Sequence, residues 1–114
     1  MIATFIAGVV LQTVAWNPAW ISQAYDRLPH YPRETRDLHW LIMREGGGNP
    51  SRHAQNPRST AYGLGQFLDS TWAGTNIGKT SRGVKQVSAM IIYCHNRYGS
   101  VAGAVRFWRA RRWY

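Results

Sequence analysis

Residues 34–48 read ETRDLHWLIMREGGG, and this stretch is the most informative part of the sequence about the fold. Its apolar residues Leu38, Leu41 and Ile42 recur with the i, i+3, i+4 spacing of one helix face. Three glycines follow, and glycine readily adopts the left-handed conformation in which many helices end. The stretch therefore predicts a helix over residues 34–45.

Glu45, the last residue of this predicted helix, is an acid in an unusual position. One further step of the apolar spacing arrives at position 45, which places the carboxyl at the edge of the apolar face. The carboxyl also lies in the last turn, where the helix dipole disfavours a negative charge. Partial burial and the dipole both raise a carboxyl pKa, as a general acid needs near neutral pH. The alternative is a frayed helix end with Glu45 in water, and the helical pattern taken alone favours that alternative.

The chain outside this helix is predicted to be mainly helical, with one long irregular segment. Residues 29–33 contain two prolines, each of which restricts the residue before it, so we expect a linker there. Residues 49–68 are rich in Asn, Pro, Ser, Thr and Gly, which indicates a loop with at most a short hairpin. Asp69 or Ser70 is expected to cap a brief helix that runs through Trp72.

Two further helices are predicted near the end of the chain. The clearer one starts at Ser81 and is closed by Gly99. Seven of its residues fall on one stripe: Val84, Val87, Ser88, Ile91, Cys94, His95 and Tyr98. A last helix follows Ser100. Four arginines decorate it: Arg106, Arg109, Arg111 and Arg112.

The composition fits one domain with a modest core, because the chain has 114 residues and is 45% hydrophobic. Fourteen Lys and Arg against five Asp and Glu give a formal net charge of +9. Such a surface favours polyanions, namely nucleic acid, acidic lipid or the anionic bacterial wall, and charge alone does not select among them. The single cysteine, Cys94, excludes an internal disulfide, and the scattered histidines predict neither a metal nor a cofactor.

The most apolar stretch of the chain is residues 1–16, MIATFIAGVVLQTVAW. It is too short and too interrupted by polar residues to span a bilayer comfortably, which takes about 20 apolar residues. It also lacks the positively charged start and clean cleavage site of a secretory signal. We expect this segment to dock, either on its own domain or on a neighbouring chain, and the sequence leaves both possibilities open.

Two motifs follow one another in the sequence, and Glu45 is the first residue of the first motif. The first is Glu45-Gly-Gly-Gly-Asn49-Pro50, and the second, residues 56–67, reads NPRSTAYGLGQF. Together they resemble the catalytic motif of the soluble lytic transglycosylases, which belong to the lysozyme-like superfamily. The residues that follow, through the terminal Trp113-Tyr114, are most similar to the lysozyme domains of phage tail and tape-measure proteins. The resemblance covers about residues 36–114.

This resemblance implies both a fold and a function. The expected fold is mainly α, α+β at most: a small lysozyme-like domain over residues 33–114, preceded by an apolar N-terminal segment and linker over residues 1–32. A substrate cleft is expected between the first helix and the loop at 49–68. The implied function is a peptidoglycan-cleaving muramidase, a lytic transglycosylase that cuts the MurNAc–GlcNAc β-1,4 bond. The implied setting is a phage virion acting in the bacterial periplasm or cell wall, attached to the particle through residues 1–16.

The resemblance also implies roles for individual residues. Glu45 is the expected acid/base, Gln66 lines the cleft, and Tyr62 belongs to the turn under the sugar. Asn56 or Ser59 is expected near the reacting N-acetyl group. For Asn56 and Ser59 the alternative is ordinary turn chemistry, which both residue types favour.

The chain departs from the family near its end. A Tyr-Asn-Ala-Gly sequence of the cellular enzymes, whose tyrosine helps to hold the catalytic Glu, is replaced by Trp108-Arg109-Ala110-Arg111. Tyr93 is one candidate for the missing contact. Core packing is the alternative for both Tyr62 and Tyr93, and it is the favoured interpretation of Trp108.

The scarcity of acids bears on the mechanism. A carboxylate mechanism has five acids to draw on: Asp26, Glu34, Asp37, Glu45 and Asp69. Two-carboxylate glycosidases need a second acid at a defined separation, and none lies within the motif. One carboxyl acting twice fits a transglycosylase that forms a 1,6-anhydro product, and hydrolysis by the same Glu45 is the close alternative.

Two other classes of protein compete with these enzymes. One is a catalytically weak or inactive structural virion protein of the same fold that lines a nucleic-acid path, although Glu45 and Gln66 argue against it. The arginines have no recognised nucleic-acid motif beside them. The other is a cellular wall enzyme anchored by residues 1–16.

Overall fold

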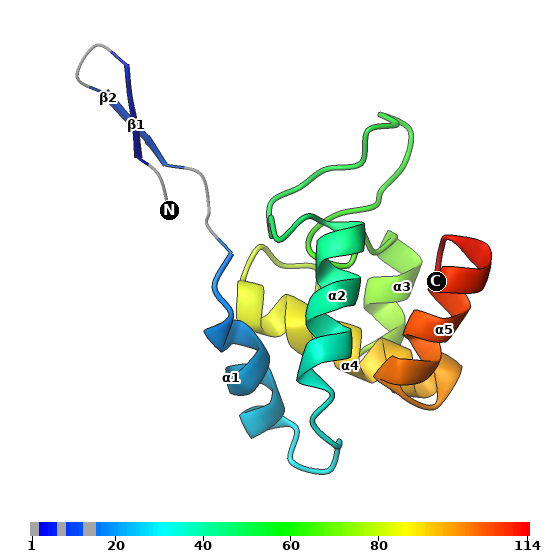
Figure 1. Cartoon of the computed structure of the whole chain (residues 1–114). Coiled ribbons are helices and arrows are strands. Elements are labelled where there is room, and N and C mark those ends of the chain that lie inside the picture. The colour runs from blue at the N-terminus through cyan, green and yellow to red at the C-terminus, as the bar shows by residue number, and fades with distance from the viewer. Residues whose placement is uncertain (1–2, 7–8, 13–15) are drawn as a thin grey trace.

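The computed structural model describes residues 3–6, 9–12 and 16–114 (Figure 1). Within these residues the chain is mainly helical, which confirms the fold class in this coarse form. The helices are α1 (Ala19–Arg27), α2 (Thr35–Glu45), α3 (Asp69–Gly74), α4 (Gly83–Tyr98) and α5 (Val101–Arg111). The strands β1 (Ala3–Ile6) and β2 (Val9–Gln12) form an antiparallel pair that Figure 1 shows apart from the helices. No helix in the described part of the chain is long and apolar enough to cross a membrane.

The helices predicted from periodicity are present with small shifts at their ends. Helix α2 ends at Glu45 as predicted, and the Ser100 side chain caps α5 by accepting a hydrogen bond from the Gly103 N–H at 2.8 Å. The predicted cap of α3 is wrong: Leu68 in an extended conformation is the N-cap, and Asp69 is the first helical residue. The Asp69 carboxylate accepts a hydrogen bond from Lys79 at 2.9 Å instead of capping the helix.

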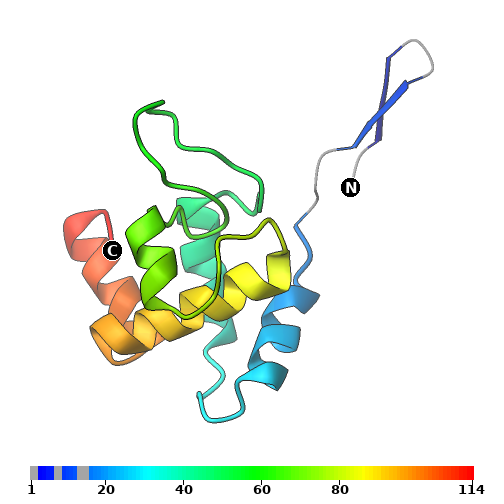
Figure 2. The same cartoon turned by 180° about the vertical axis from the view of Figure 1, so that it is seen from behind.

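Helix α4 is the centre of the hydrophobic core. Figure 2 shows it running across the molecule from α1 to α5, and it packs against both helices. The predicted stripe on α4 is largely buried, including Val87, Ile91 and Cys94. From α2, Leu38, Leu41 and Ile42 are fully buried in the same core. The remaining core members come from α1, the loop, α3, α4 and α5: Ile21, Ala24, Tyr25, Leu64, Phe67, Trp72, Ala89, Met90, Val101, Ala104 and Val105.

Helix α1 was missed in the sequence, although Ile21, Ala24 and Tyr25 have the i, i+3, i+4 spacing of a buried face. These side chains belong to the common core, so from Ala19 onward the segment over residues 1–32 packs as part of the helical body. The expected docking of residues 1–16 lies outside the described residues, apart from the two strands and Trp16.

Glu34 joins the first part of the helical body to the last. Its carboxylate accepts hydrogen bonds from the backbone N–H groups of Val101 and Ala102, at 2.9 and 3.0 Å. Its own N–H donates to the Tyr25 hydroxyl at 3.0 Å. A carboxylate at a helix N-terminus satisfies free N–H groups and complements the helix dipole. Glu34 therefore has a structural role at the start of α5.

Candidate active site

The end of α2 and the loop that follows it approach each other closely at Gly46. A Cβ at this position would lie 2.7 Å from the carbonyl oxygens of Gly63 and Leu64. Only glycine permits this approach, because any side chain would collide with the loop backbone. The contact brings Glu45, the residue before Gly46, beside the loop residues Gly65 and Gln66.

Gln86 on α4 anchors this loop through hydrogen bonds from its side-chain amide. The side chain is buried, its Oε1 accepts from the Leu64 N–H at 2.8 Å, and its Nε2 donates to the carbonyls of Pro50 and Thr80 at 2.7 and 2.6 Å. Gly63 lies next to the Gln86 side chain and has a positive φ of +86°. A Cβ at Gly63 would lie 2.7 Å from the Gln86 amide. One buried amide thus fixes both ends of the loop.

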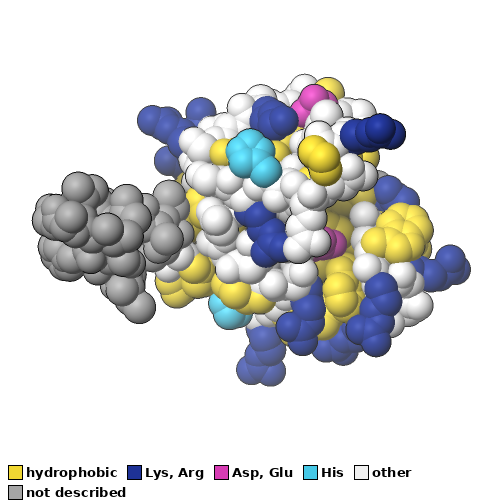
Figure 3. All heavy atoms as spheres, turned by 90° about the horizontal axis from the view of Figure 1, so that it is seen from above, with side chains coloured by type: hydrophobic (Ala, Val, Ile, Leu, Met, Phe, Trp, Pro, Cys, Tyr) yellow, Lys and Arg dark blue, Asp and Glu magenta, His cyan; other side chains and the backbone are white. Residues whose placement is uncertain are grey.

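A cavity of about 370 Å³ opens beside Glu45. Its walls come from the end of α2, the loop, α3, α4 and the end of the chain: Glu45, Gly65, Gln66, Phe67, Leu68, Thr71, Tyr93, Arg97, Trp113 and Tyr114. Figure 3 looks down on the end of the molecule where α2 ends and shows an acidic side chain recessed between hydrophobic and basic side chains. The cavity is therefore a cleft with a carboxyl, several aromatic rings and one cation in its walls.

Glu45 is half-buried, and Trp108 on α5 is its hydrogen-bond partner. The Trp108 Nε1–H donates to Glu45 Oε1 at 3.2 Å. Burial raises the pKa of the Glu45 carboxyl above its ordinary value, and the bond from Trp108 opposes this rise in part. The predicted placement of Glu45 at a partly buried helix edge is confirmed, and the direction of its pKa shift is the one that a general acid requires.

Glu45 is the only acid among the residues that line this cleft. Asp26 and Asp69 form ion pairs at the surface. Glu34 caps α5, and Asp37 lies in the first turn of α2, at the opposite end from Glu45. Chemistry in this cleft that needs an acidic side chain therefore has one to use.

Gln66 and Tyr93 line the same cavity as Glu45, and a role of Gln66 toward a substrate stays a prediction. The Gln66 backbone is left-handed, with φ 51°, and its Nε2 donates to the carbonyls of Arg52 and Gly63 at 3.0 and 2.9 Å. No hydrogen bond joins Tyr93 to Glu45 among the described residues, and the Tyr93 hydroxyl accepts one from Arg97 at 3.0 Å. That candidate contact is wrong, and Trp108 supplies the hydrogen bond from the other side.

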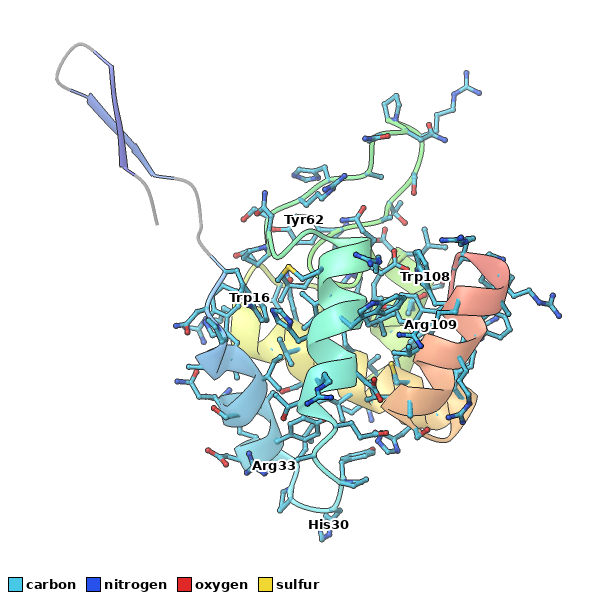
Figure 4. The ribbon with its side chains drawn as sticks, viewed as in Figure 1. Trp16, His30, Arg33, Tyr62, Trp108 and Arg109 are labelled. Atoms are coloured by element: carbon cyan, nitrogen blue, oxygen red, sulfur yellow. The ribbon has the colours of Figure 1, made fainter. Side chains whose placement is uncertain are left out.

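The structure does not place Asn56, Ser59 or Tyr62 in the cleft wall. Asn56 Oδ1 accepts from the Arg58 N–H at 3.0 Å, and Ser59 Oγ accepts from the Ala61 N–H at 3.1 Å. Both bonds are the local turn chemistry that these residue types favour. Tyr62 packs beside a histidine in the loop (Figure 4). A role of these three residues in sugar binding stays a prediction.

Several residues of the site were not predicted from the sequence. The sequence favours core packing for Trp108, and it predicts no role for the wall residues Arg97, Trp113 and Tyr114. The Tyr114 hydroxyl donates to the Gly65 carbonyl at 3.1 Å, and burial raises its pKa well above the ordinary value, so it remains a neutral donor. The signal was the concentration of aromatic residues at the end of the chain, which has no helical spacing.

In the part of the chain that the structure describes, no group of three His, Cys, Asp or Glu side chains could hold a metal ion. No protein-family model, curated protein or solved structure matches this chain. The chemistry of the cleft itself therefore carries the functional argument.

Proposed function

We propose that this chain is a muramidase of lysozyme-like fold that cleaves the glycan strands of peptidoglycan, with Glu45 as its single acid/base. The observation that carries the proposal is one half-buried carboxyl with a raised pKa in a cleft that holds no other acid. The sequence motifs around Glu45 add the substrate class, because they resemble those of the soluble lytic transglycosylases.

The contact with Trp108 assigns different tasks to the two oxygens of Glu45. An indole N–H can only donate, so Oε1 acts as the acceptor and Oε2 is left to carry the acidic proton. In the first step Oε2–H protonates the glycosidic oxygen, and the C1–O bond to the leaving sugar breaks. The ionised carboxylate then keeps the hydrogen bond from Trp108, which stabilises its charge.

The second step in the proposal returns the proton to Glu45. The substrate's own N-acetyl group stabilises the cationic C1, and Glu45 takes the proton from the muramic 6-hydroxyl. The oxygen of that hydroxyl bonds to C1 and gives a 1,6-anhydro product without consuming water. The lack of a second Asp or Glu side chain among the described residues of the cleft wall supports this route over a two-carboxylate hydrolysis.

The walls of the cleft suit a polysaccharide. Trp113 and Tyr114 offer aromatic surface to the apolar faces of sugar rings, while Thr71 and Gln66 offer polar groups to hydroxyls. Binding sites for organic ligands commonly combine apolar walls with a few polar groups in this way.

The proposal includes a setting, which rests on the sequence resemblance alone. The motifs are most similar to the lysozyme domains of phage tail proteins, so we propose that the chain is carried by a virion and acts on the bacterial wall. Residues 1–16 are the proposed attachment.

Digestion of purified sacculi tests this proposal. Glu45→Gln should lower the release of muropeptides by about a hundred- to ten-thousand-fold, because an amide cannot donate and recover the proton. Asp69→Asn, at an acid outside the cleft, is the matched control and should keep near-normal activity. Mass analysis of the products should show 1,6-anhydromuramic ends. Products with only reducing ends, heavier by one water, would make the protein a hydrolase, and an active Glu45→Gln would refute the assignment of the site.

A further inference from the structure

Three arginines are stacked on two neighbouring tryptophans where α2 and α5 meet. The rings of Trp40 and Trp108 form a T-shaped pair with centroids 5.2 Å apart. The guanidinium carbons of Arg44 and Arg109 lie 4.9 and 5.0 Å from the centre of the Trp40 ring, and that of Arg112 lies 5.7 Å from the centre of the Trp108 ring. Figure 4 shows Trp108 and Arg109 extending from α5 toward α2. We call these five residues the arginine–tryptophan patch.

The positive charge of this patch has no partner within the described part of the chain. The ion pairs found there involve Asp26, Asp69 and Glu34, and none of them includes an arginine of the patch. All three arginines are exposed. A guanidinium that stacks on an aromatic ring keeps its N–H edge free for an oxyanion, so the patch presents several donors held in place by the rings.

Fold stability explains only two of these arginines. Arg44 and Arg109 lie in the last turns of α2 and α5, where the helix dipole favours a cation. Arg112 lies beyond α5 in the left-handed region, with φ 66°, where glycine is the favoured residue. An arginine is conformationally unfavourable at this position, so its presence there points to a use of the side chain.

We propose that the arginine–tryptophan patch binds a flexible phosphodiester polymer through its phosphates, and specifically a polyol phosphate without bases. Arginine recognises phosphate oxygens through paired N–H donors. Proteins that bind single-stranded nucleic acid stack bases on free aromatic rings, whereas Trp40 and Trp108 are already occupied by guanidiniums and by each other. Duplex DNA is stiff, with a persistence length of about 150 base pairs, and holds its phosphates in a fixed array, whereas a flexible polyol chain can adjust the positions of its phosphates to the three guanidiniums.

The position of the patch relates it to the cleft without depending on catalysis. Trp108 carries Arg112 on its ring and donates to Glu45 from its indole nitrogen. A polymer held by the patch would therefore lie at the side of α5 that supports the carboxyl. Binding is measured without cleavage, so a failure of this inference leaves the proposed function standing, and the reverse also holds.

Titration of the full-length protein with purified poly(glycerol phosphate) at several salt concentrations tests the inference. The triple variant Arg44→Gln, Arg109→Gln, Arg112→Gln should bind at least about ten-fold more weakly. Its salt dependence should fall by roughly 2 units of slope, since each phosphate contact on a single-stranded polyanion contributes about 0.7. The control removes the same charge from exposed positions elsewhere, at Arg27, Arg58 and Arg82. An equal loss in the two triple variants would show an effect of net charge alone and overturn the proposal.

Two further arms make the result decisive. Arg112→Gly places glycine at a left-handed position, so its melting temperature should stay unchanged or rise while its affinity falls. Wild-type affinity in this variant would refute the role of Arg112, even if the triple variant failed to fold. A 20-base-pair duplex should bind more weakly than the polyol phosphate. Tighter, patch-dependent binding of the duplex would assign the patch to nucleic acid and overturn the stated ligand.

Discussion

Replacing Gln86 with leucine tests how the loop of the candidate site is held. The change keeps a side chain of similar size in the core but removes all three hydrogen bonds of the amide. It leaves the N–H of Leu64 and the carbonyls of Pro50 and Thr80 without that partner. Two of the three bonds anchor residues 49–66, the loop that carries one wall of the cleft.

The magnitude follows from the burial of these groups. A buried hydrogen bond contributes about 1 kcal/mol net, and a buried polar group left without a partner costs about 1–3 kcal/mol. Three bonds to one fully buried amide therefore give a loss on the order of 3–5 kcal/mol in the free energy of unfolding. Small domains have about 5–15 kcal/mol in total, so the variant should retain only part of its stability.

Urea unfolding followed by far-UV circular dichroism measures this loss. Ser88→Ala is the matched control on the same helix. The Ser88 hydroxyl donates a hydrogen bond to the Val84 carbonyl one turn earlier, at 3.0 Å. Removing this hydroxyl leaves no backbone group of the loop without a hydrogen-bond partner. We expect the control to lose less than about 1 kcal/mol. An equally small loss for Gln86→Leu would show that the loop is held by other contacts and refute the reasoning.

Three further predictions concern Glu45 and the N-terminus. Trp108→Phe removes the bond that lowers the Glu45 pKa, so the pH above which cleavage declines should rise; an unchanged profile would contradict the contact. Burial raises the pKa of Glu45 in the folded protein above the ordinary value of about 4.5. The protonated carboxyl therefore contributes its full stabilisation below about pH 4.5, and this contribution is lost as the pH rises through the pKa of the folded protein. Glu45→Gln should therefore melt higher than the wild type at pH 7 but not at pH 3, as calorimetry can check. Deleting residues 1–15 should leave the melting temperature within a few degrees and abolish attachment to virions, whereas an insoluble product would place the segment in the core.

The parts of the fold that could be predicted are those in which the signal is local. The apolar spacing in α2 and α4, with a glycine after each helix, depends on residues within one or two turns. The same spacing exists in α1, but Pro29 and Pro32 predict a linker that separates this segment from the predicted domain. What the sequence lacked was the partner of α1. A Cβ at Gly83 would lie 2.4 Å from the Trp20 ring, and such a contact between α4 and α1 has no sequence signature.

In the candidate site, too, the features that could be predicted are local in the sequence and the others are not. The edge position of Glu45 was visible in the spacing, because burial of one helix face is a property of that helix. Its hydrogen bond is not local, since Trp108 lies 63 residues further along the chain. The resemblance implies a tyrosine partner, and Tyr93 is the wrong residue because the hydrogen bond to Glu45 comes from Trp108. The role of Gly46 was also misread: its φ is −101°, and it is required for close approach to the loop.

An indole partner has chemical consequences that a phenol would not have. A tyrosine hydroxyl can donate or accept, so it could follow the proton on and off a carboxyl by rotating. The Trp108 N–H only donates, and the ring is held against Trp40, so the bond always favours the ionised carboxylate. Burial favours the protonated form, and the pKa of Glu45 reflects the balance of these two opposed effects. Because α5 supplies the indole and Glu34 binds the N-terminus of α5, the protonation of Glu45 depends on the position of α5 relative to α2. The same packing that completes the core therefore also tunes the acid.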